Sequence, residues 1–203
     1  MIAIIDYGMG NVQSIANMLD HLSLDAVITS NIEKISNASH LILPGVGAFD
    51  QAMTLLEELN LIPVIHQFAT TGKPILGICL GMQLLGDGSE EGIKPGLSLI
   101  PFTNRRFTRQ LVGDLRVPHM GWNSVTIQSD NLITKGLMAD SRFYFVHSYF
   151  ASDVKSEHVM LQSNYGFDFA SAVCKGNIFG VQFHPEKSHA YGMALLEAFA
   201  KVN

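Results

Sequence analysis

The amino-acid sequence predicts an α/β fold: a mostly parallel β-sheet flanked by helices, with an additional antiparallel β region. In the first half of the chain, short continuous apolar runs alternate with stretches whose apolar residues recur at helical spacing. Such an alternation is typical of parallel sheets that are covered by helices on both faces. After residue 97 the runs become shorter, and Gly, Pro and Asn separate them, as is usual in antiparallel sheets.

The elements of the first half can be placed in order. Asp6 and a glycine-containing turn end the first strand, and Asn11 can cap the helix that follows. Gly8 and Gly10 suggest a dinucleotide-binding turn, but Gln13 occupies the position of the third glycine, so we reject that interpretation. We expect strands over residues 2–5, 26–29, 41–43 and 74–78, and helices from residue 12, over 32–35, and over 49–60 and 62–69 with a break around Pro63.

The second half is expected to form the antiparallel region and then to rejoin the main sheet. A polar, glycine-rich loop over residues 86–92 marks the change. We expect short strands between residues 97 and 128, further strands over 142–146, 159–161, 169–174 and 178–182, and a closing helix over 191–201.

Composition limits the classes of protein that this chain can belong to. With 203 residues, 47% hydrophobic and 15% charged, residues 1–203 are most simply one globular domain. The net charge of −5 does not suggest a nucleic-acid-binding surface, and no apolar run approaches the length of a membrane span. Cys79 and Cys174 have neither disulfide-framework nor zinc-site spacing, so we expect a cytoplasmic protein without membrane attachment.

Cys79 lies where the chain passes from a strand into a helix with almost no connection. Gly77 and Gly81 flank it, two residues away on either side, where side chains would crowd a sharp turn. A turn of this type lifts a nucleophile above the end of a sheet and directs helix N–H groups at it. The alternative is a buried structural cysteine, which is a common role for a single cysteine.

A second segment supplies what a cysteine nucleophile needs. His184 and Glu186 flank Pro185, which blocks helical continuation and holds His184 in an extended conformation. A thiol with an ordinary pKa is mostly protonated at neutral pH, so an imidazole beside it would activate it. A carboxylate can orient that imidazole. Cys79, His184 and Glu186 therefore form a catalytic triad in outline.

Two further segments can complete such a site. The loop at residues 44–47 contains Gly45 and Gly47 and follows the third strand, so its backbone N–H groups can approach a ligand. The alternative is an ordinary strand-to-helix turn. Gln83 lies one helical turn after Cys79, so its amide can face the same site.

Five motifs carry a resemblance to a known family. They are G-I-C-L-G-M-Q at residues 77–83, Q-F-H-P-E at 182–186, P-G-V-G at 44–47, V-P-H-M-G-W-N at 117–123 and Y-F-V-H-S-Y at 144–149. In this order they resemble the class I glutamine amidotransferases, and among these the glutaminase subunits of imidazole glycerol phosphate synthases. The resemblance covers nearly the whole chain and implies a flavodoxin-like sheet.

The resemblance implies that glutamine is hydrolysed at Cys79, His184 and Glu186, without a metal or cofactor. Its other implied site residues fall into three groups. An oxyanion hole would be formed by the backbone of Leu80 and of Val46 or Gly47. Glutamine would be bound by Gly45, Gln83, His147, Ser148 and Tyr149. A (β/α)₈-barrel cyclase subunit, the heterodimer partner, would contact Asn11, Trp122, Tyr144 and Lys187. The ammonia would pass to that partner for histidine biosynthesis.

Several alternatives remain at this point. The segment at residues 96–100, the loop at 86–88 and the tail at 186–193 differ from many histidine-pathway members, so the acceptor could instead be a surface sugar that receives an amidino group. A cysteine peptidase or a redox protein of related fold would use the same turn, and a non-catalytic binding subunit would keep only the fold. A metal site at His147, His184 and His189 is disfavoured because none has a second histidine at helical spacing.

Overall fold

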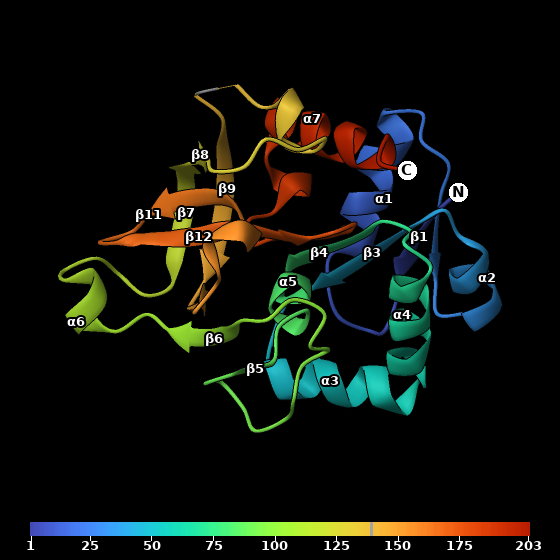
Figure 1. Ribbon diagram of the computed structural model, residues 1–203, viewed down its shortest axis with the longest axis horizontal. Helices are drawn as coiled ribbons and strands as arrows, with labels where there is room; N and C mark the ends of the chain where they lie inside the picture. Colours follow the sequence, from blue (N-terminus) through green and yellow to red (C-terminus); the bar gives the residue numbers. More distant parts are fainter. Residues whose placement is uncertain (139) are drawn as a thin grey trace.

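Parallel strands from distant parts of the sequence lie side by side in the centre of the molecule (Figure 1). The computed structural model describes residues 1–138 and 140–203. The central strands follow the order β2-β1-β3-β4-β13, and each neighbouring pair is parallel. This is the flavodoxin-like order, with ligand sites expected at the carboxyl ends of the strands. The strands are β1 (Ile2–Ile5), β2 (Ala26–Thr29), β3 (His40–Gly45), β4 (Ile75–Cys79) and β13 (Ile178–Val181).

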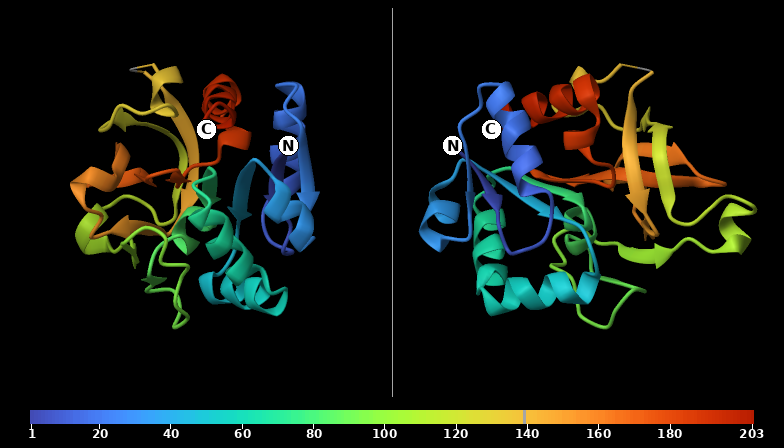
Figure 2. Two further views of the ribbon diagram at one scale, coloured as in Figure 1. Left: turned by 45° about the vertical axis from the view of Figure 1, so that its right-hand side comes forward. Right: turned by 180° about the vertical axis from the view of Figure 1, so that it is seen from behind.

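Helices cover both faces of this sheet because its strands are apolar on both sides (Figures 1 and 2). Ile2 and Ile4 pack in the same cluster as α1 and α7, whereas Ala3 and Ile5 pack with α2, α3 and α4 on the opposite face. The helices are α1 (Val12–His21), α2 (Ile32–Asn37), α3 (Phe49–Glu58), α4 (Leu61–Thr70), α5 (Leu80–Leu84) and α7 (His189–Ala200).

An antiparallel region extends the sheet beyond β13, as the sequence predicts. β12 pairs with β13, β10 with β12, and β6 with β10, all antiparallel, and β5 then pairs parallel with β6. β11 pairs with β12 and β8, while β7 and β9 form a separate antiparallel ribbon. The remaining elements are β5 (Gly88–Ser89), β6 (Thr103–Arg106), α6 (Arg109–Val112), β7 (His119–Ser124), β8 (Thr126–Ile127), η1 (Thr134–Gly136), β9 (Arg142–His147), β10 (Tyr149–Ser152), η2 (Ser156–His158), β11 (Val159–Asn164), β12 (Asp168–Lys175) and η3 (Pro185–Lys187).

Some expected boundaries are wrong, for local reasons. The break between the third and fourth helices lies at Asn60, whose φ of 54° ends the helical path, and not at Pro63. Pro63 lies in the first turn of α4, where a backbone N–H has no intrahelical acceptor. Between residues 97 and 128 the chain also forms the short helix α6 instead of strands alone. The closing helix begins at His189, two residues before the expected start.

No helix within residues 1–138 or 140–203 is long and apolar enough to cross a lipid bilayer.

Candidate active site

Cys79 occupies a strained turn at the carboxyl end of β4. Its φ and ψ are 54° and −111°, outside the region that a residue with a side chain normally adopts, and α5 begins at the next residue. A Cβ at Gly77 would lie 2.6 Å from the carbonyl oxygen of Gly81. A Cβ at Gly81 would overlap the carbonyl oxygen of Leu43. Both glycines are therefore required for α5 to pack closely against β3 and β4.

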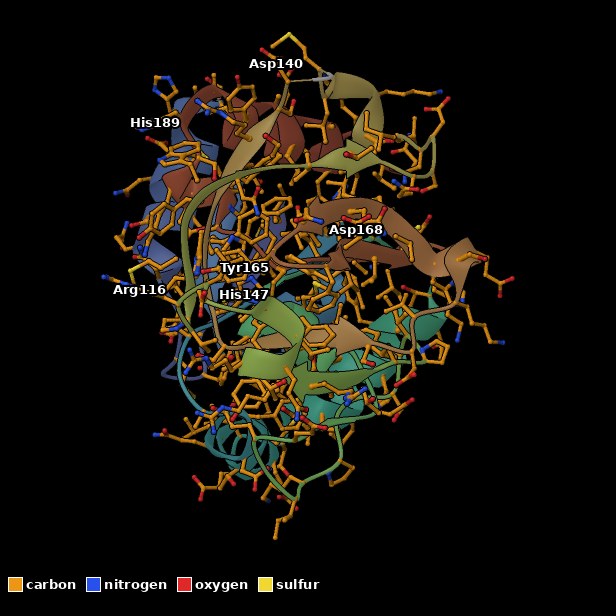
Figure 3. The ribbon with its side chains drawn as sticks, turned by 90° about the vertical axis from the view of Figure 1, so that its left-hand side faces the viewer. Arg116, Asp140, His147, Tyr165, Asp168 and His189 are labelled. Atoms are coloured by element: carbon orange, nitrogen blue, oxygen red, sulfur yellow. The ribbon has the colours of Figure 1, made fainter. Side chains whose placement is uncertain are left out.

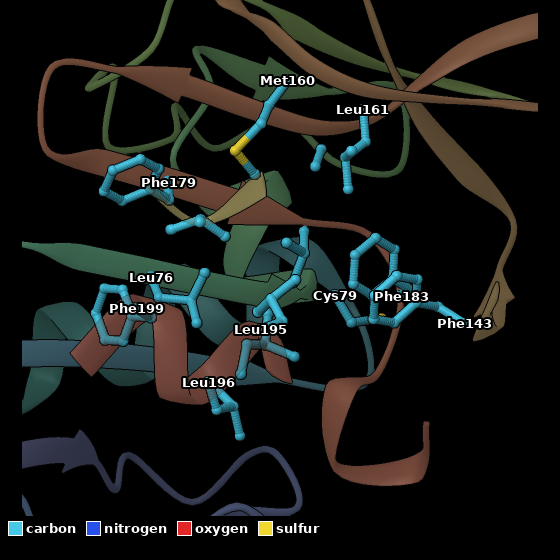
Figure 4. Packing of buried hydrophobic residues seen from close by; sticks show 14 of the residues in the cluster. Leu76, Cys79, Phe143, Met160, Leu161, Phe179, Phe183, Leu195, Leu196 and Phe199 are labelled. Atoms are coloured by element: carbon cyan, nitrogen blue, oxygen red, sulfur yellow. The ribbon is translucent and has the colours of Figure 1, made fainter. Parts of the chain in front are cut away.

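His184 reaches the same edge of the sheet because β13 runs parallel to β4, so the two carboxyl ends lie side by side. The imidazole Nδ1 lies 2.7 Å from Oε1 of Glu186, and the exposed fractions of the two side chains are only 2% and 1%. Figure 4 shows Cys79 beside Phe183 and Phe143 at the border of the buried cluster. The structure thus brings Cys79, His184 and Glu186 together, although Cys79 is more than 100 residues away in sequence.

The surroundings of His184 favour its protonated form. Burial disfavours the charge, but the neighbouring Cys79 and the Glu186 carboxylate outweigh this effect and raise the pKa of His184 to about 9. Nδ1 faces Glu186, and Nε2 has no hydrogen-bond partner of normal geometry within the described residues. Both His184 and Cys79 line the cavity described below. Nε2 is therefore the nitrogen that can exchange a proton with the sulfur or with a bound substrate.

Ser188 holds the histidine backbone in place and was not predicted from the sequence. Its hydroxyl donates to the carbonyl of His184 at 2.6 Å and accepts the N–H of Tyr144 at 3.0 Å. The N–H of His184 in turn donates to the carbonyl of Tyr144 at 2.9 Å. The backbone of β9 is therefore bonded directly to the triad histidine. No sequence motif marks Ser188, because its role depends on a contact with a strand 44 residues away.

A cavity of about 330 Å³ opens beside the triad. It is lined by most of the predicted glutamine-binding and oxyanion residues. Glu91, Pro118 and Val146 also line it but were not predicted as site residues, although Pro118 and Val146 lie within the motifs at 117–123 and 144–149. The lining is formed by Val46, Gly47, Cys79, Leu80, Gln83, Glu91, Pro118, Val146, His147, Ser148, Tyr149 and His184. Gly45 is not in the lining but lies beneath it, where a Cβ would come within 2.7 Å of the Tyr7 hydroxyl and 3.0 Å of the Leu80 Cβ.

Two buried glutamines lie next to each other beside the sulfur: Gln83 lines the cavity, and Gln182 lies behind it. Nε2 of Gln83 donates to Oε1 of Gln182 at 3.1 Å and, more weakly, to the carbonyl of Tyr149 at 3.4 Å. Nε2 of Gln182 lies 3.8 Å from the sulfur of Cys79. Both N–H groups of Gln83 are thus used inside the protein, which leaves its carbonyl oxygen to accept a hydrogen bond from a ligand. Gln182 was not among the predicted site residues, although it begins the Q-F-H-P-E motif at residues 182–186.

Two backbone segments line the cavity together with Cys79. Leu80 is the first residue of α5, so its N–H has no intrahelical acceptor. The second segment is the loop with Val46 and Gly47, in which Gly47 has a φ of 111°. The carboxylate of Glu91 accepts the N–H of Phe49 at 2.9 Å and so ties the start of α3, just after this loop, to the cavity wall.

The residues expected to face a partner are grouped around the β7–β9 ribbon. Trp122 and Tyr144 are cross-strand neighbours with ring centroids 6.4 Å apart, and Lys187 Nζ lies 5.8 Å from the Tyr144 ring centroid. Trp122 is 44% exposed although it is large and apolar. Asn11 precedes α1, which contacts the η3 segment that carries Lys187. The side chain of Asn11 makes no capping hydrogen bond, although the sequence suggested one.

Within residues 1–138 and 140–203, no group of three or more His, Cys, Asp or Glu side chains is placed to hold a metal ion. Both ring nitrogens of His147 bond within the protein, to His119 and to the Tyr149 carbonyl. His189 stacks on Trp122 with ring centroids 5.7 Å apart.

Comparison with known proteins gives consistent matches over the whole chain. The model of the family "Glutamine amidotransferase class-I" matches residues 3–202. A protein of Methanococcus maripaludis named imidazole glycerol phosphate synthase subunit HisH 2 is 50% identical, over 99% of each chain. A Pseudomonas aeruginosa protein of the same name is 46% identical, over 100% of each chain.

Solved structures support the fold independently. The structure titled "Structure of PurLQS from Thermotoga maritima" superimposes with a TM-score of 0.77 at 17% identity, covering 98% of this chain and 96% of the other. At this identity the likeness concerns the fold alone. The family model and the full-length relatives carry the conclusion: this chain belongs to the class I glutamine amidotransferase family.

Proposed function

We propose that this protein is the glutaminase subunit of an imidazole glycerol phosphate synthase, and that it hydrolyses glutamine to glutamate and ammonia with Cys79 as nucleophile. The observation that carries the proposal is the convergence of Cys79, His184 and Glu186 at one cavity, in a chain whose full-length relatives bear the name of this subunit. As an enzyme of the glutamine amidotransferase family, it needs such a nucleophile and a proton carrier beside it.

In the first step the Cys79 thiolate attacks the side-chain carbonyl of glutamine, so the carbon–sulfur bond forms and the carbonyl π electrons move to oxygen. The oxyanion then re-forms the carbonyl as the carbon–nitrogen bond breaks, and protonated His184 gives its Nε2 proton to the departing nitrogen, which leaves ammonia and a glutamyl thioester. Neutral His184 then removes a proton from water, which attacks the glutamyl thioester and releases glutamate and the thiolate. Glu186 supports this cycle because it keeps Nδ1 protonated and stabilises the imidazolium charge.

The oxyanion of each tetrahedral intermediate needs donors on the side opposite the histidine. We assign this role to the N–H of Leu80 and to an N–H of the loop at Val46 and Gly47, since all three residues line the cavity together with Cys79. Removing one donor of this kind typically costs about 3 to 4 kcal/mol of activation free energy.

Glutamine recognition is assigned to the rest of the lining. The carbonyl oxygen of Gln83 accepts from the substrate, because its own N–H groups are occupied. Glu91 offers a carboxylate to the substrate α-ammonium group, and Ser148 and Tyr149 line the same cavity. His147 contributes the face of its ring and its backbone, since its ring nitrogens are already bonded.

Ammonia that escapes into water is protonated and loses its nucleophilicity, so the activity implies a synthase partner. We propose a (β/α)₈-barrel cyclase docked on the surface formed by Asn11, Trp122, Tyr144 and Lys187. Residues 1–203 then act as one amidotransferase domain, with the family match over residues 3–202 as support. A cytoplasmic location fits two free cysteines, one of them a proposed thiolate nucleophile.

The test compares substitution of the two cysteines. In complex with the barrel subunit, Cys79→Ala is expected to abolish ammonia release from glutamine, whereas Cys174→Ala, the matched control, retains it. Glutaminase activity in Cys79→Ala would remove this cysteine from the mechanism. With amide-¹⁵N glutamine and the partner present, label entering an imidazole nucleotide supports the histidine pathway, and label entering an amidino sugar contradicts it.

A further inference from the structure

A chain of hydrogen bonds with a fixed direction begins at Asn123 on β7. The Asn123 amide can have only one orientation: its Oδ1 accepts the N–H of Ser124 at 2.8 Å, and its Nδ2 donates to the carbonyl of Asn164 at 2.8 Å. Backbone N–H groups only donate and carbonyl groups only accept, so these two contacts leave no alternative. The second Nδ2 hydrogen points at Nε2 of His119, 3.2 Å away.

The contact between Asn123 Nδ2 and His119 Nε2 determines the proton positions on two histidines, His119 and His147. Since Nε2 of His119 accepts a hydrogen bond, a neutral His119 carries its proton on Nδ1, which lies 2.9 Å from Nε2 of His147. Nε2 of His147 is therefore an acceptor, and the His147 proton is on Nδ1, which donates to the Tyr149 carbonyl at 2.7 Å. The opposite tautomer of His147 would place a nitrogen lone pair against that carbonyl oxygen.

The surroundings of His119 and His147 keep both imidazole rings uncharged, so that each ring carries a single proton on Nδ1. His119 and His147 are only 3% and 5% exposed. Burial lowers the pKa of His119 to about 4 and is also the main reason why the pKa of His147 is lowered to about 3. His119 is also held between aromatic rings, with centroids 4.0 Å from Tyr165 and 4.7 Å from Phe145. Figure 3 shows the side chains of His147 and Tyr165 in this region.

The chain of hydrogen bonds ends at the sulfur of Cys79, the proposed nucleophile. The Tyr149 carbonyl that accepts the hydrogen bond from His147 Nδ1–H also accepts one from Gln83, whose amide donates to Gln182. Gln182 presents its own N–H group to the Cys79 sulfur at 3.8 Å. The hydrogen bonds thus continue from Asn123, next to Trp122 on the proposed partner surface, to the sulfur atom. His119 and Asn123 take part although neither lines the glutamine cavity.

We propose that Asn123, His119 and His147 form a proton-ordered relay that fixes the Tyr149 carbonyl, and through it the amide of Gln83, in the wall of the glutamine cavity. His119 and Asn123 are then positioning residues for glutamine binding. This inference rests on the proposed function, because it assumes that glutamine occupies the cavity.

The kinetic test uses His119→Phe, which keeps an aromatic ring between Tyr165 and Phe145 but removes both hydrogen bonds. With the barrel subunit bound, we expect the KM for glutamine to rise about tenfold, as for the loss of one hydrogen bond that orders the site. Tyr165→Phe is the matched control: it lies in the same stack, but its hydroxyl bonds to the Arg116 carbonyl outside the relay. Its KM should stay within about twofold of the wild type.

Active enzyme is counted by alkylation of the thiol with an electrophilic glutamine analogue. Misfolding would lower the fraction that is alkylated and leave KM unchanged, whereas loss of the relay raises KM in fully alkylated enzyme. A fully alkylated His119→Phe with wild-type KM would overturn the proposal.

Nitrogen-15 NMR of the wild-type chain tests the proton order without any activity. We expect His119 and His147 each to show a protonated Nδ1 and an unprotonated Nε2, unchanged from about pH 5 to pH 8. An Nε2–H tautomer or an imidazolium at either position would refute the relay. If instead the wild-type complex releases no ammonia, the proposed function fails, and the NMR result still decides on the relay.

Discussion

Replacing Glu186 by glutamine removes one negative charge and leaves the shape of the triad intact. In Glu186→Gln the side-chain oxygen can still accept from His184 Nδ1, so the imidazole keeps its tautomer. The charge that stabilises the imidazolium is lost at a distance of 2.7 Å, in a site where the carboxylate side chain is 1% exposed. The substitution therefore measures the electrostatic contribution of Glu186 almost alone.

The size of the effect follows from this geometry. A hydrogen bond to a charged group contributes about 1.5 to 3 kcal/mol, and the neutral bond that Glu186→Gln retains contributes about 0.5 to 1.5 kcal/mol. The difference of about 1 to 1.5 kcal/mol corresponds to roughly a 5-fold to 13-fold change in rate. We expect kcat/KM for glutamine to fall within this range. The pKa of His184, about 9 in the native protein, should fall in the variant because Glu186 is one of the groups that raise it.

A matched control is available on α7. Glu197 also has a cation partner at 2.7 Å, Lys201 Nζ, but its side chain is 52% exposed. Surface pairs of this kind contribute little, so Glu197→Gln should leave kcat/KM unchanged. Both variants are assayed as complexes by coupled measurement of glutamate, at saturating partner. If Glu186→Gln matched the wild type within about twofold, Glu186 would have no electrostatic role in catalysis.

The remaining predictions concern packing, docking and pH. Gly81→Ala should lower the free energy of unfolding by about 3 kcal/mol in thermal denaturation, because the added Cβ would overlap the Leu43 carbonyl. Gly88→Ala is the control and should be nearly neutral, since the atom nearest to its added Cβ lies 3.9 Å away. Equal melting temperatures for the two variants would contradict the close packing of Gly81 against β3. Trp122→Ala should weaken binding of the barrel subunit by about 2 kcal/mol in titration calorimetry, and an unchanged Kd would place the interface elsewhere. The stabilising effect of the raised His184 pKa is complete below the ordinary value of 6.5, so both the free energy of unfolding and kcat/KM should decline as pH rises towards about 9. Flat profiles over that range would show that His184 does not titrate there.

Much of the fold could be predicted because its signals are local. The apolar runs at residues 2–5 and 26–29 coincide with β1 and β2, since buried parallel strands are apolar on both faces. The turn at Cys79 was predictable because Gly77 and Gly81 are fixed by close backbone contacts within a few residues or with the adjacent strand. Pro63 misled the prediction, because a proline in the first turn of a helix is compatible with the helix it was expected to break.

The rest of the site depends on strand register, which no local pattern reveals. His119 meets His147 because the two residues are paired across the β7–β9 ribbon. Gln182 meets Gln83 across 99 residues of sequence because β13 lies beside β4. The motifs that contain these residues were visible in the sequence, but the direction of the hydrogen bonds between them required coordinates.

In the proposed mechanism Cys79 carries the glutamyl group during turnover. Rapid acid quenching of the complex during glutamine hydrolysis, followed by mass spectrometry of its peptides, detects this group on the residue that carries it. We expect one glutamyl group, bound as a thioester to the peptide that contains Cys79 and absent from the peptide that contains Cys174. Steady glutamine hydrolysis with the glutamyl group on any other residue would contradict this mechanism.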